Sequence, residues 1–521
     1  MALNNLKLTA FYRKYESYIL LFIFLILGLI LRLHHIGLRP YWLDEANSVN
    51  LVFLKFSDLY GQIITTGNSL AYIYFIKIWS YFFGSSELAI RSLSILAGLL
   101  AIILIYKLGR LLFNKTAALW AAFLLAVNYF SIFYSIQARP YSLEILFSIL
   151  SYFYFAKILK SAGWANLIFY ILFTAVGVYF HPWFFLVFVS QIFYLLIARN
   201  RNFKIYLSQA AIAIICLPWV AILIKLAKLG FSEFITGADL TAIAWTLYYF
   251  TYGNKNLILL FSIIALFAMV FQKKNSHGNI EISIREEALN NFNKNNLLVH
   301  NYLLFPLLSA FFIAQFIPFY ETGRYEAVVL PAFILILASL WSNFKNKIII
   351  VLIGLSLIYG SFSAVQEEKN TILSFKLNDR TVTQEILNRI TDGDWLVFTG
   401  LSRPPFDYYL DNLNQNHKIF NKFSFPAEMA DHPAFLNEKR LMNNYDKINQ
   451  EADELLEKFV SSEANKMFVV YSGGETSQLL VDKLNKKLKN ALTVEVADKD
   501  SFGGNYHSLN FHFLSILIYE K

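Results

Sequence analysis

Several charged or imidazole side chains of this 521-residue chain stand beside long apolar segments, where such groups are costly and usually functional. The acidic pair Asp44 and Glu45 follows the first apolar segment, and Arg139, His181 and Arg324 each stand at the end of a later one. A carboxylate can act as a general base toward a hydroxyl or amine. Arginines bind phosphate through forked hydrogen bonds and stabilise a departing phosphate. These residue types favour sugar transfer from a phosphate at a membrane surface, most simply a lipid headgroup.

Each of these residues also has a structural interpretation. The acidic pair could cap a helix, because carboxylates suit the positive end of the helix dipole. Arg139 and Arg324 could be anchors at the lipid headgroups. His181 could cap a buried turn, and Arg91 could pair with Glu87, four residues earlier on the same helix face.

The composition shows that the elements that position these residues are surrounded in part by lipid. Apolar residues make up 57% of the chain and charged residues 16%, against roughly 45–50% and about 25% in soluble domains. So much apolar surface requires lipid as one solvent, which excludes a soluble enzyme, a disordered chain and a coiled coil. The single cysteine, Cys216, excludes an internal disulfide and a cysteine-rich metal site.

Long apolar segments predict eleven transmembrane helices, since a helix needs about 20 apolar residues to cross the hydrocarbon. The segment Ser161–Ala198 is too long for one crossing, and His181-Pro182 in its middle predicts two helices that meet at a tight turn. The other predicted helices are Tyr18–Gly37, Leu88–Tyr106, Thr116–Ala138, Tyr141–Ala156, Ile205–Ile224, Asn256–Gln272, Leu297–Tyr320, Ala327–Phe344 and Ile348–Val365.

The lysines and arginines predict the orientation of these helices. With a cytoplasmic N-terminus, the inner flanks carry roughly twice as many of them as the outer loops before the tail. The net charge of +9 is therefore a sign of membrane topology, and no nucleic-acid partner is needed to explain it. We expect a multi-pass protein of the plasma (inner) membrane, with its candidate catalytic residues facing outward.

The predicted organisation is a transmembrane domain, residues 1–365, and an extracytoplasmic α/β domain, residues 366–521. The first outer loop, residues 38–87, contains apolar residues at helical spacing from Val49 to Ile64. This pattern predicts an amphipathic helix in the outer membrane interface, or alternatively a helix packed on the tail. In the tail, strands are predicted at Trp395–Thr399, Met467–Tyr471 and Phe511–Tyr519, helices at Glu451–Val460 and Gln478–Leu488, and turns at Gly473-Gly474 and Gly503-Gly504.

Five short motifs occur in the order in which a known family has them. They are Tyr41–Ala46 (YWLDEA), Phe83–Ser94 (FGSSELAIRSLS), Ser135–Ser142 (SIQARPYS), His181–Trp183 (HPW), and Gly323–Tyr325 (GRY) followed by Leu330-Pro331. Over about residues 15–345 the chain resembles the GT-C glycosyltransferases. The nearest resemblance is to bacterial relatives of the dolichyl-phosphate-mannose–protein mannosyltransferases (glycosyltransferase family 39) and of the lipid A aminoarabinose transferase.

The resemblance implies a polyprenyl-phosphate-sugar donor, an inverting transfer of a hexosyl or pentosyl group, and a glycan, lipid or protein acceptor of the cell envelope. It implies these roles: catalysis by Asp44, as the base, and Glu45; donor phosphate binding by Arg324, Arg139 and Tyr325; and substrate binding by His181, Tyr320, Tyr141 and Arg91. Many relatives carry a His or Glu beside a Pro-Pro pair in the first outer loop, where this chain reads Thr66–Tyr72 (TGNSLAY). No metal site or other cofactor is therefore predicted.

Two other classes of protein remain open at this point. A transporter or flippase of lipid-linked sugars would also place arginines near a lipid headgroup, but it would show polar residues near mid-bilayer and often repeated halves. A structural subunit of an envelope assembly would act through its tail. Convergence of the candidate residues on one place favours the enzyme, whereas scattered positions favour membrane anchors.

Overall fold

The computed structural model describes residues 2–34, 36–228, 238–239, 241–252, 254–256, 258–260, 262–263, 271–276, 279–284, 294–342, 347–374, 378–430, 441–495 and 515–521. The chain divides into two compact units. Unit 1 contains Met1–Ile36, Arg91–Ile224 and Ile235–Glu368, and unit 2 contains Gly37–Ile90, Lys225–Phe234 and Lys369–Lys521.

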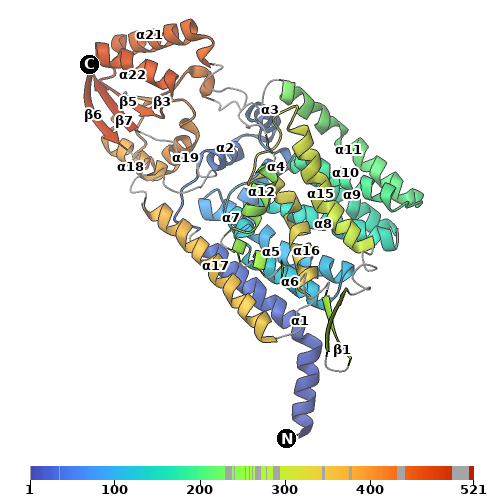
Figure 1. Ribbon diagram of the computed structural model, residues 1–521. Helices are drawn as coiled ribbons and strands as arrows, with labels where there is room; N and C mark the ends of the chain where they lie inside the picture. Colours follow the sequence, from blue (N-terminus) through green and yellow to red (C-terminus); the bar gives the residue numbers. More distant parts are fainter. Residues whose placement is uncertain are drawn as a thin grey trace. The chain divides into compact units, whose positions relative to one another are not determined.

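Unit 1 is built mainly from apolar helices (Figure 1). They are α1 (Ala2–Leu33), α5 (Glu87–Leu112), α6 (Lys115–Val127), α7 (Tyr129–Ser135), α8 (Tyr141–Lys160), α9 (Trp164–Phe180), α10 (Trp183–Ile197), α11 (Phe203–Lys228), α12 (Thr241–Phe250), α15 (Lys294–Ile313), η2 (Tyr325–Val329), α16 (Leu330–Trp341) and α17 (Lys347–Ser374). A hairpin of β1 (Phe271–Ser276) and β2 (Asn279–Ile284) lies between α12 and α15 in the sequence.

Among the described residues, six helices are long and apolar enough to cross a membrane, or seven if α6 and α7 form one broken span. Four shorter apolar helices accompany them. The fold class of a polytopic helical membrane protein is confirmed, while the count of eleven spans stays a prediction. About half of the predicted helix Asn256–Gln272 lies outside the described residues, and its predicted end is wrong, because Phe271 and Gln272 begin strand β1.

The helices α9 and α10 meet at His181-Pro182, as predicted. The predicted helix Thr116–Ala138 is instead broken, because α6 and α7 meet at an angle of 56°. Asn128 is extended at the break, and its side chain accepts the N–H of Ser131 at 2.9 Å. The buried Arg32 of α1 donates to the carbonyl of Ala126 at 3.2 Å and to the hydroxyl of Ser131 at 3.0 Å. Arg32 therefore satisfies a carbonyl that the broken helix leaves without its usual partner.

Unit 2 contains a five-stranded sheet in the order β4-β3-β5-β7-β6. Its strands are β3 (Trp395–Thr399), β4 (Asn421–Phe425), β5 (Lys466–Tyr471), β6 (Lys489–Glu495) and β7 (Ser515–Glu520). The central strand β3 is parallel to β4 and β5, whereas β7 is antiparallel to β5 and β6. The strands β3 and β5 are buried on both faces, which explains their continuous apolar runs.

Two helices cover each face of this sheet (Figure 1). Side chains of α18 (Asp379–Arg389) and α19 (Arg403–Leu413) pack on one face, around Phe398 and Val470. Side chains of α21 (Tyr445–Ser461) and α22 (Glu475–Lys487) pack on the other, around Val397 and Val469. The alternation along each strand therefore builds two separate apolar cores.

The segment predicted as the first outer loop forms α2 (Leu43–Asn50), η1 (Leu51–Phe53), α3 (Phe56–Thr66) and α4 (Leu70–Phe83). The single amphipathic helix expected between Val49 and Ile64 is thus divided in two. The reason is Lys77 of α4, whose ammonium group is bound by the carbonyls of Val52 and Leu54 at 2.8 and 2.5 Å. Because these carbonyls bind Lys77, they do not accept the N–H groups of a continuous helix, and the helical segment of α2 and η1 ends before α3 begins.

Candidate functional site

The motif Gly323–Tyr325 in unit 1 forms a tight turn that a buried carboxylate holds in place. Glu326, which is fully buried, accepts the backbone N–H of Gly323 at 2.5 Å and that of Arg324 at 3.1 Å. It also accepts the hydroxyl of Thr246 in α12 at 3.2 Å. Both carboxylate oxygens therefore fix the backbone from which the Arg324 side chain extends.

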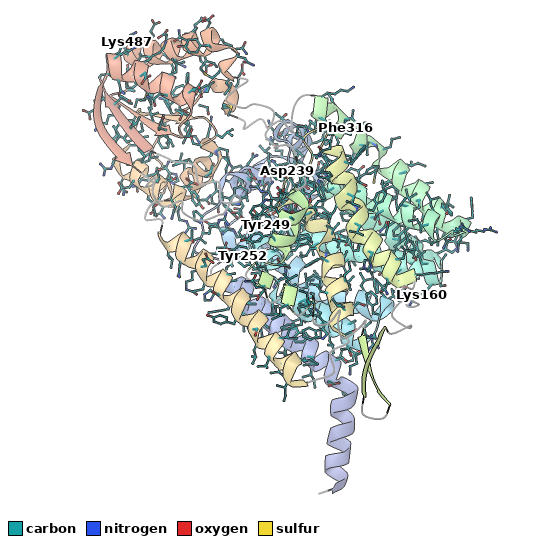
Figure 2. The ribbon with its side chains drawn as sticks, viewed as in Figure 1. Lys160, Asp239, Tyr249, Tyr252, Phe316 and Lys487 are labelled. Carbon is teal, nitrogen blue, oxygen red and sulfur yellow. The ribbon has the colours of Figure 1, made fainter. Side chains whose placement is uncertain are left out.

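Gly323 is required at this turn for two physical reasons. Its φ of +88° is a left-handed conformation that disfavours residues with a Cβ. A Cβ there would also lie 3.1 Å from the ring of Tyr249, labelled on α12 in Figure 2. The hydroxyl of Tyr134 in α7 donates to the Gly323 carbonyl. Three elements thus hold the turn: α7, α12 and η2, which contains Glu326.

His181 lies at the turn between α9 and α10 with its ring against Tyr325, the centroids 4.3 Å apart. The backbone N–H of Trp183 donates to its Nδ1 at 3.2 Å, so the neutral ring carries its proton on Nε2. Burial, and then the positive charge of Arg139, lower the pKa of His181 to about 3. The ring is therefore a neutral hydrogen-bond donor at physiological pH.

Several predicted donor-site residues of unit 1 meet around Tyr325. Its hydroxyl interacts electrostatically with Tyr141, Glu321, Arg324 and Arg139. Arg139 also acts on His181. These residues come from the start of α8, the α9–α10 turn and the segment before α16, which are far apart in the sequence. The structure therefore places these side chains within electrostatic range of Tyr325, with the His181 ring in contact with it.

Two other predicted substrate-binding residues make contacts within the protein. The hydroxyl of the buried Tyr320 lies 2.7 Å from that of Thr246, and its ring meets Trp183 edge-on at 4.9 Å. Arg91 is also buried and donates to the carbonyl of Ile36 at 3.0 Å. Both contacts position the polypeptide, and the predicted substrate contacts of these two residues remain proposals.

The acidic pair lies in unit 2, in the first turn of α2. Glu45 is fully buried and accepts the N–H of Trp42 at 3.3 Å, the reciprocal contact of a capping box. Asp44 is half-buried at the preceding position. Glu45 thus caps α2, as the structural interpretation expected, whereas Asp44 precedes it and does not make this capping contact with Trp42.

The backbone before the acidic pair is held by the tail, within the same unit. The hydroxyl of Tyr409 in α19 accepts the N–H of Tyr41 at 2.7 Å and donates to Glu87 at 2.8 Å. Glu87 also forms an ion pair with Arg380 of α18. The sequence showed Glu87 beside Arg91, but it gave no signal for Tyr409 or Arg380, because more than 290 residues separate either one from Glu87.

In the part of the chain that the structure describes, no group of three or more His, Cys, Asp or Glu side chains could hold a metal ion. The polar side chains of the predicted donor site around Tyr325 are mainly those of arginines and tyrosines. These bind anions, and they are poor ligands for a divalent cation.

The comparisons with known proteins agree with this architecture. Residues 68–224 match the family model of dolichyl-phosphate-mannose-protein mannosyltransferase. The crystal structure of ArnT from Cupriavidus metallidurans bound to undecaprenyl phosphate is similar to this chain, with a TM-score of 0.60 and 11% identity over 95% of this chain and 97% of that one. The chain has the GT-C fold.

The apo form of the same ArnT gives a TM-score of 0.57, also at 11% identity and over the same shares of the two chains. The apo oligosaccharyltransferase of Archaeoglobus fulgidus gives 0.49 at 13% identity, over 88% of this chain and 70% of that one. No curated protein matches the sequence. The resemblance predicted from the five motifs is thus confirmed, and a membrane glycosyltransferase is supported.

Proposed function

We propose that this chain is an inverting glycosyltransferase that moves a sugar from a polyprenyl-phosphate-sugar to an acceptor at the outer membrane face. The observation that carries the proposal is that the charges of Arg139 and Arg324 both act on the hydroxyl of Tyr325, whose ring lies against His181. These two guanidinium groups outnumber the one carboxylate, Glu321, that acts on the same hydroxyl, and together with the neutral imidazole they favour an anion over a cation. The structure of ArnT with undecaprenyl phosphate supports a lipid phosphate as that anion.

On the donor side, the arginines bind the phosphate that links sugar and lipid. In the transfer, the bond between the anomeric carbon and the phosphate oxygen breaks, and its electron pair leaves with the polyprenyl phosphate. The guanidinium groups stabilise the charge that develops on that leaving group. The Nε2–H of the neutral His181 donates a further hydrogen bond to the donor, and Tyr141 and Tyr325 flank the sugar.

On the acceptor side, Asp44 is the general base. It takes the proton of the acceptor hydroxyl or amine as the acceptor atom forms its bond to the anomeric carbon. Attack opposite to the leaving phosphate inverts the anomeric configuration. Glu45 has a different part in this scheme, because its carboxylate caps α2 and so holds the Asp44 backbone.

The proposed function requires one orientation of the chain in the membrane. The N-terminus lies in the cytoplasm, and the domain from residue 366 onward lies outside, with the first outer loop. The acceptor of the proposed transfer is a glycan, lipid or protein of the cell envelope. The domain supports the acidic motif through Tyr409, which gives the tail a structural part in the reaction.

The test is a transfer assay with the full chain in liposomes and undecaprenyl-phosphate-sugars labelled in the sugar. Release of undecaprenyl phosphate together with labelled product is expected for one donor of the panel. Arg324→Gln should abolish release, whereas Arg389→Gln, which alters an exposed ion pair with Glu385, should leave it unchanged. Movement of intact donor between the leaflets without any release would refute the enzyme and establish a flippase.

A further inference from the structure

The sheet of the tail contains a topological switch point between β3 and β5. These neighbouring strands are parallel, so their carboxyl ends lie at the same edge of the sheet. After β3 the chain enters α19, which packs on one face, and after β5 it enters α22, which packs on the other. In open sheets of parallel strands, ligands bind where two successive connections leave toward opposite faces.

The two loops at this edge are fastened to one another. Thr399 ends β3, and its Oγ1 accepts the N–H of Ser472 at 3.0 Å. The Ser472 hydroxyl in turn donates to the Thr399 carbonyl at 2.8 Å. Gly400 follows with a φ of +56°, and a Cβ on it would lie only 2.6 Å from the Ser472 Oγ. The loops therefore approach so closely that glycine is needed between them.

The N-terminus of α22 points its first turn at the same place. This helix of 13 residues begins after Gly473-Gly474, and its N-cap, Gly474, supplies no side-chain cap. The first backbone N–H groups of a helix carry partial positive charge and bind anions. Gly474 is exposed, so this end of the helix is open to solvent.

Ser477, in that first turn, is a second and independent indication of a ligand. Its side chain is fully buried, and its Oγ has no hydrogen-bond partner among the described residues. The Oγ lies 3.8 Å from the Cβ position of Gly400, so it points from the helix toward the loop after β3. A buried hydroxyl without a partner is unfavourable, and a hydrogen bond to a ligand oxygen would remove that cost.

We propose that the edge between β3 and β5 binds a phosphate group, held by the Ser477 hydroxyl and the first-turn N–H groups of α22. Hydroxyl and backbone N–H donors match the oxygens of a tetrahedral anion. The Gly473-Gly474 turn shifts to admit the ligand, which its two glycines allow at little cost. The site is separate from the proposed transfer reaction and does not depend on it.

The experiment is hydrogen exchange measured by mass spectrometry on the full chain in detergent. Inorganic phosphate, glucose 1-phosphate and farnesyl phosphate are the probes, and glucose is the uncharged control. Because exchange is read peptide by peptide, binding at α22 is separated from binding at Arg139 and Arg324. We expect each phosphate probe, but not glucose, to slow exchange at the start of α22. A sugar ester that binds more tightly than inorganic phosphate indicates a water-soluble ligand, and a prenyl ester that does so indicates a lipid.

The matched variants are Ser477→Ala and Ser462→Ala. Ser462 precedes β5 at the opposite edge of the sheet, and its hydroxyl donates to the carbonyl of Phe459 at 2.7 Å. Ser477→Ala should weaken phosphate binding at least about fivefold without lowering Tm, because it removes a hydroxyl that has no partner. Ser462→Ala should bind like the natural chain.

Glu475→Gln provides the opposite test, because this exposed carboxylate stands in the first turn of α22. Removing its negative charge should tighten phosphate binding about twofold. Full chain that shows no change at α22 with any phosphate probe at about 20 mM would overturn the proposal. So would a Ser477→Ala chain that binds phosphate as tightly as the Ser462→Ala chain.

Discussion

The Glu326→Gln substitution tests whether the buried carboxylate of Glu326 holds the Arg324 turn in place. In the natural chain both carboxylate oxygens accept a backbone N–H, from Gly323 and from Arg324. A carboxamide has the same shape but only one accepting atom. One of the two N–H groups must then face an amide NH₂ inside the protein.

The magnitude follows from these contacts. A buried N–H without an acceptor costs about 1–3 kcal/mol. Burial raises the pKa of Glu326 to about 7, so above that pH the remaining bond also loses its charge, which roughly halves its strength. We therefore expect Glu326→Gln to lower the free energy of unfolding by about 2–4 kcal/mol. A displaced Arg324 would lose a forked contact to phosphate, which corresponds to roughly 10–100-fold weaker donor binding.

The assay combines thermal unfolding in detergent with donor titration in the transfer reaction. Glu385→Gln is the control, because that carboxylate forms an exposed pair with Arg389 at 3.1 Å, worth about 0.3–0.5 kcal/mol. Glu326→Gln should lower Tm and raise the donor KM, whereas Glu385→Gln should change neither. A Glu326→Gln chain with the Tm and donor KM of the natural chain would refute the role assigned to this carboxylate.

Three further predictions concern the candidate residues of unit 1 and of unit 2. Arg324→Lys should insert normally but lose at least about tenfold in donor affinity, since an ammonium cannot form two parallel hydrogen bonds; full donor affinity in a titration would leave Arg139 as the phosphate ligand. Tyr409→Phe should leave the N–H of Tyr41 without its acceptor and reduce turnover about tenfold at unchanged donor affinity, and unaltered turnover would show that the tail does not position the acidic motif. The pKa of His181, about 3, lies below the 6.5 of an ordinary histidine. The contribution of His181 to folding stability is therefore complete above pH 6.5 and declines as the pH falls toward 3. Because the ring stays neutral between pH 5 and 8, the dependence of activity on pH in that range should have the same shape for His181→Gln as for the natural chain.

Local sequence patterns predicted several features of this chain correctly. The His181-Pro182 turn divides a long apolar segment, because proline disfavours helical backbone in the residue before it. The capping interpretation of Glu45 likewise rests on its place at the start of a helix. Such features depend on neighbours in the sequence, which a pattern can show.

Features that depend on distant partners could not be predicted. The break at Asn128 relies on Arg32, which lies 94 residues before the carbonyl of Ala126. The division of the expected amphipathic helix relies on Lys77, and the anchoring of Tyr41 relies on Tyr409, 368 residues away. The role of Glu326 also depends on a distant partner, because its carboxyl accepts the hydroxyl of Thr246, 80 residues earlier, as well as two backbone N–H groups.

The most direct measurement of the central claim is single-turnover release of undecaprenyl phosphate by Asp44→Asn and by the natural chain. The substitution keeps the size of the side chain but removes the group that takes a proton. We predict a release rate lower by roughly 10²–10⁴, the usual contribution of a general base, with donor affinity and membrane insertion unchanged. Release by Asp44→Asn at the natural rate would contradict the account, because Asp44 would then be only a residue in the first turn of α2.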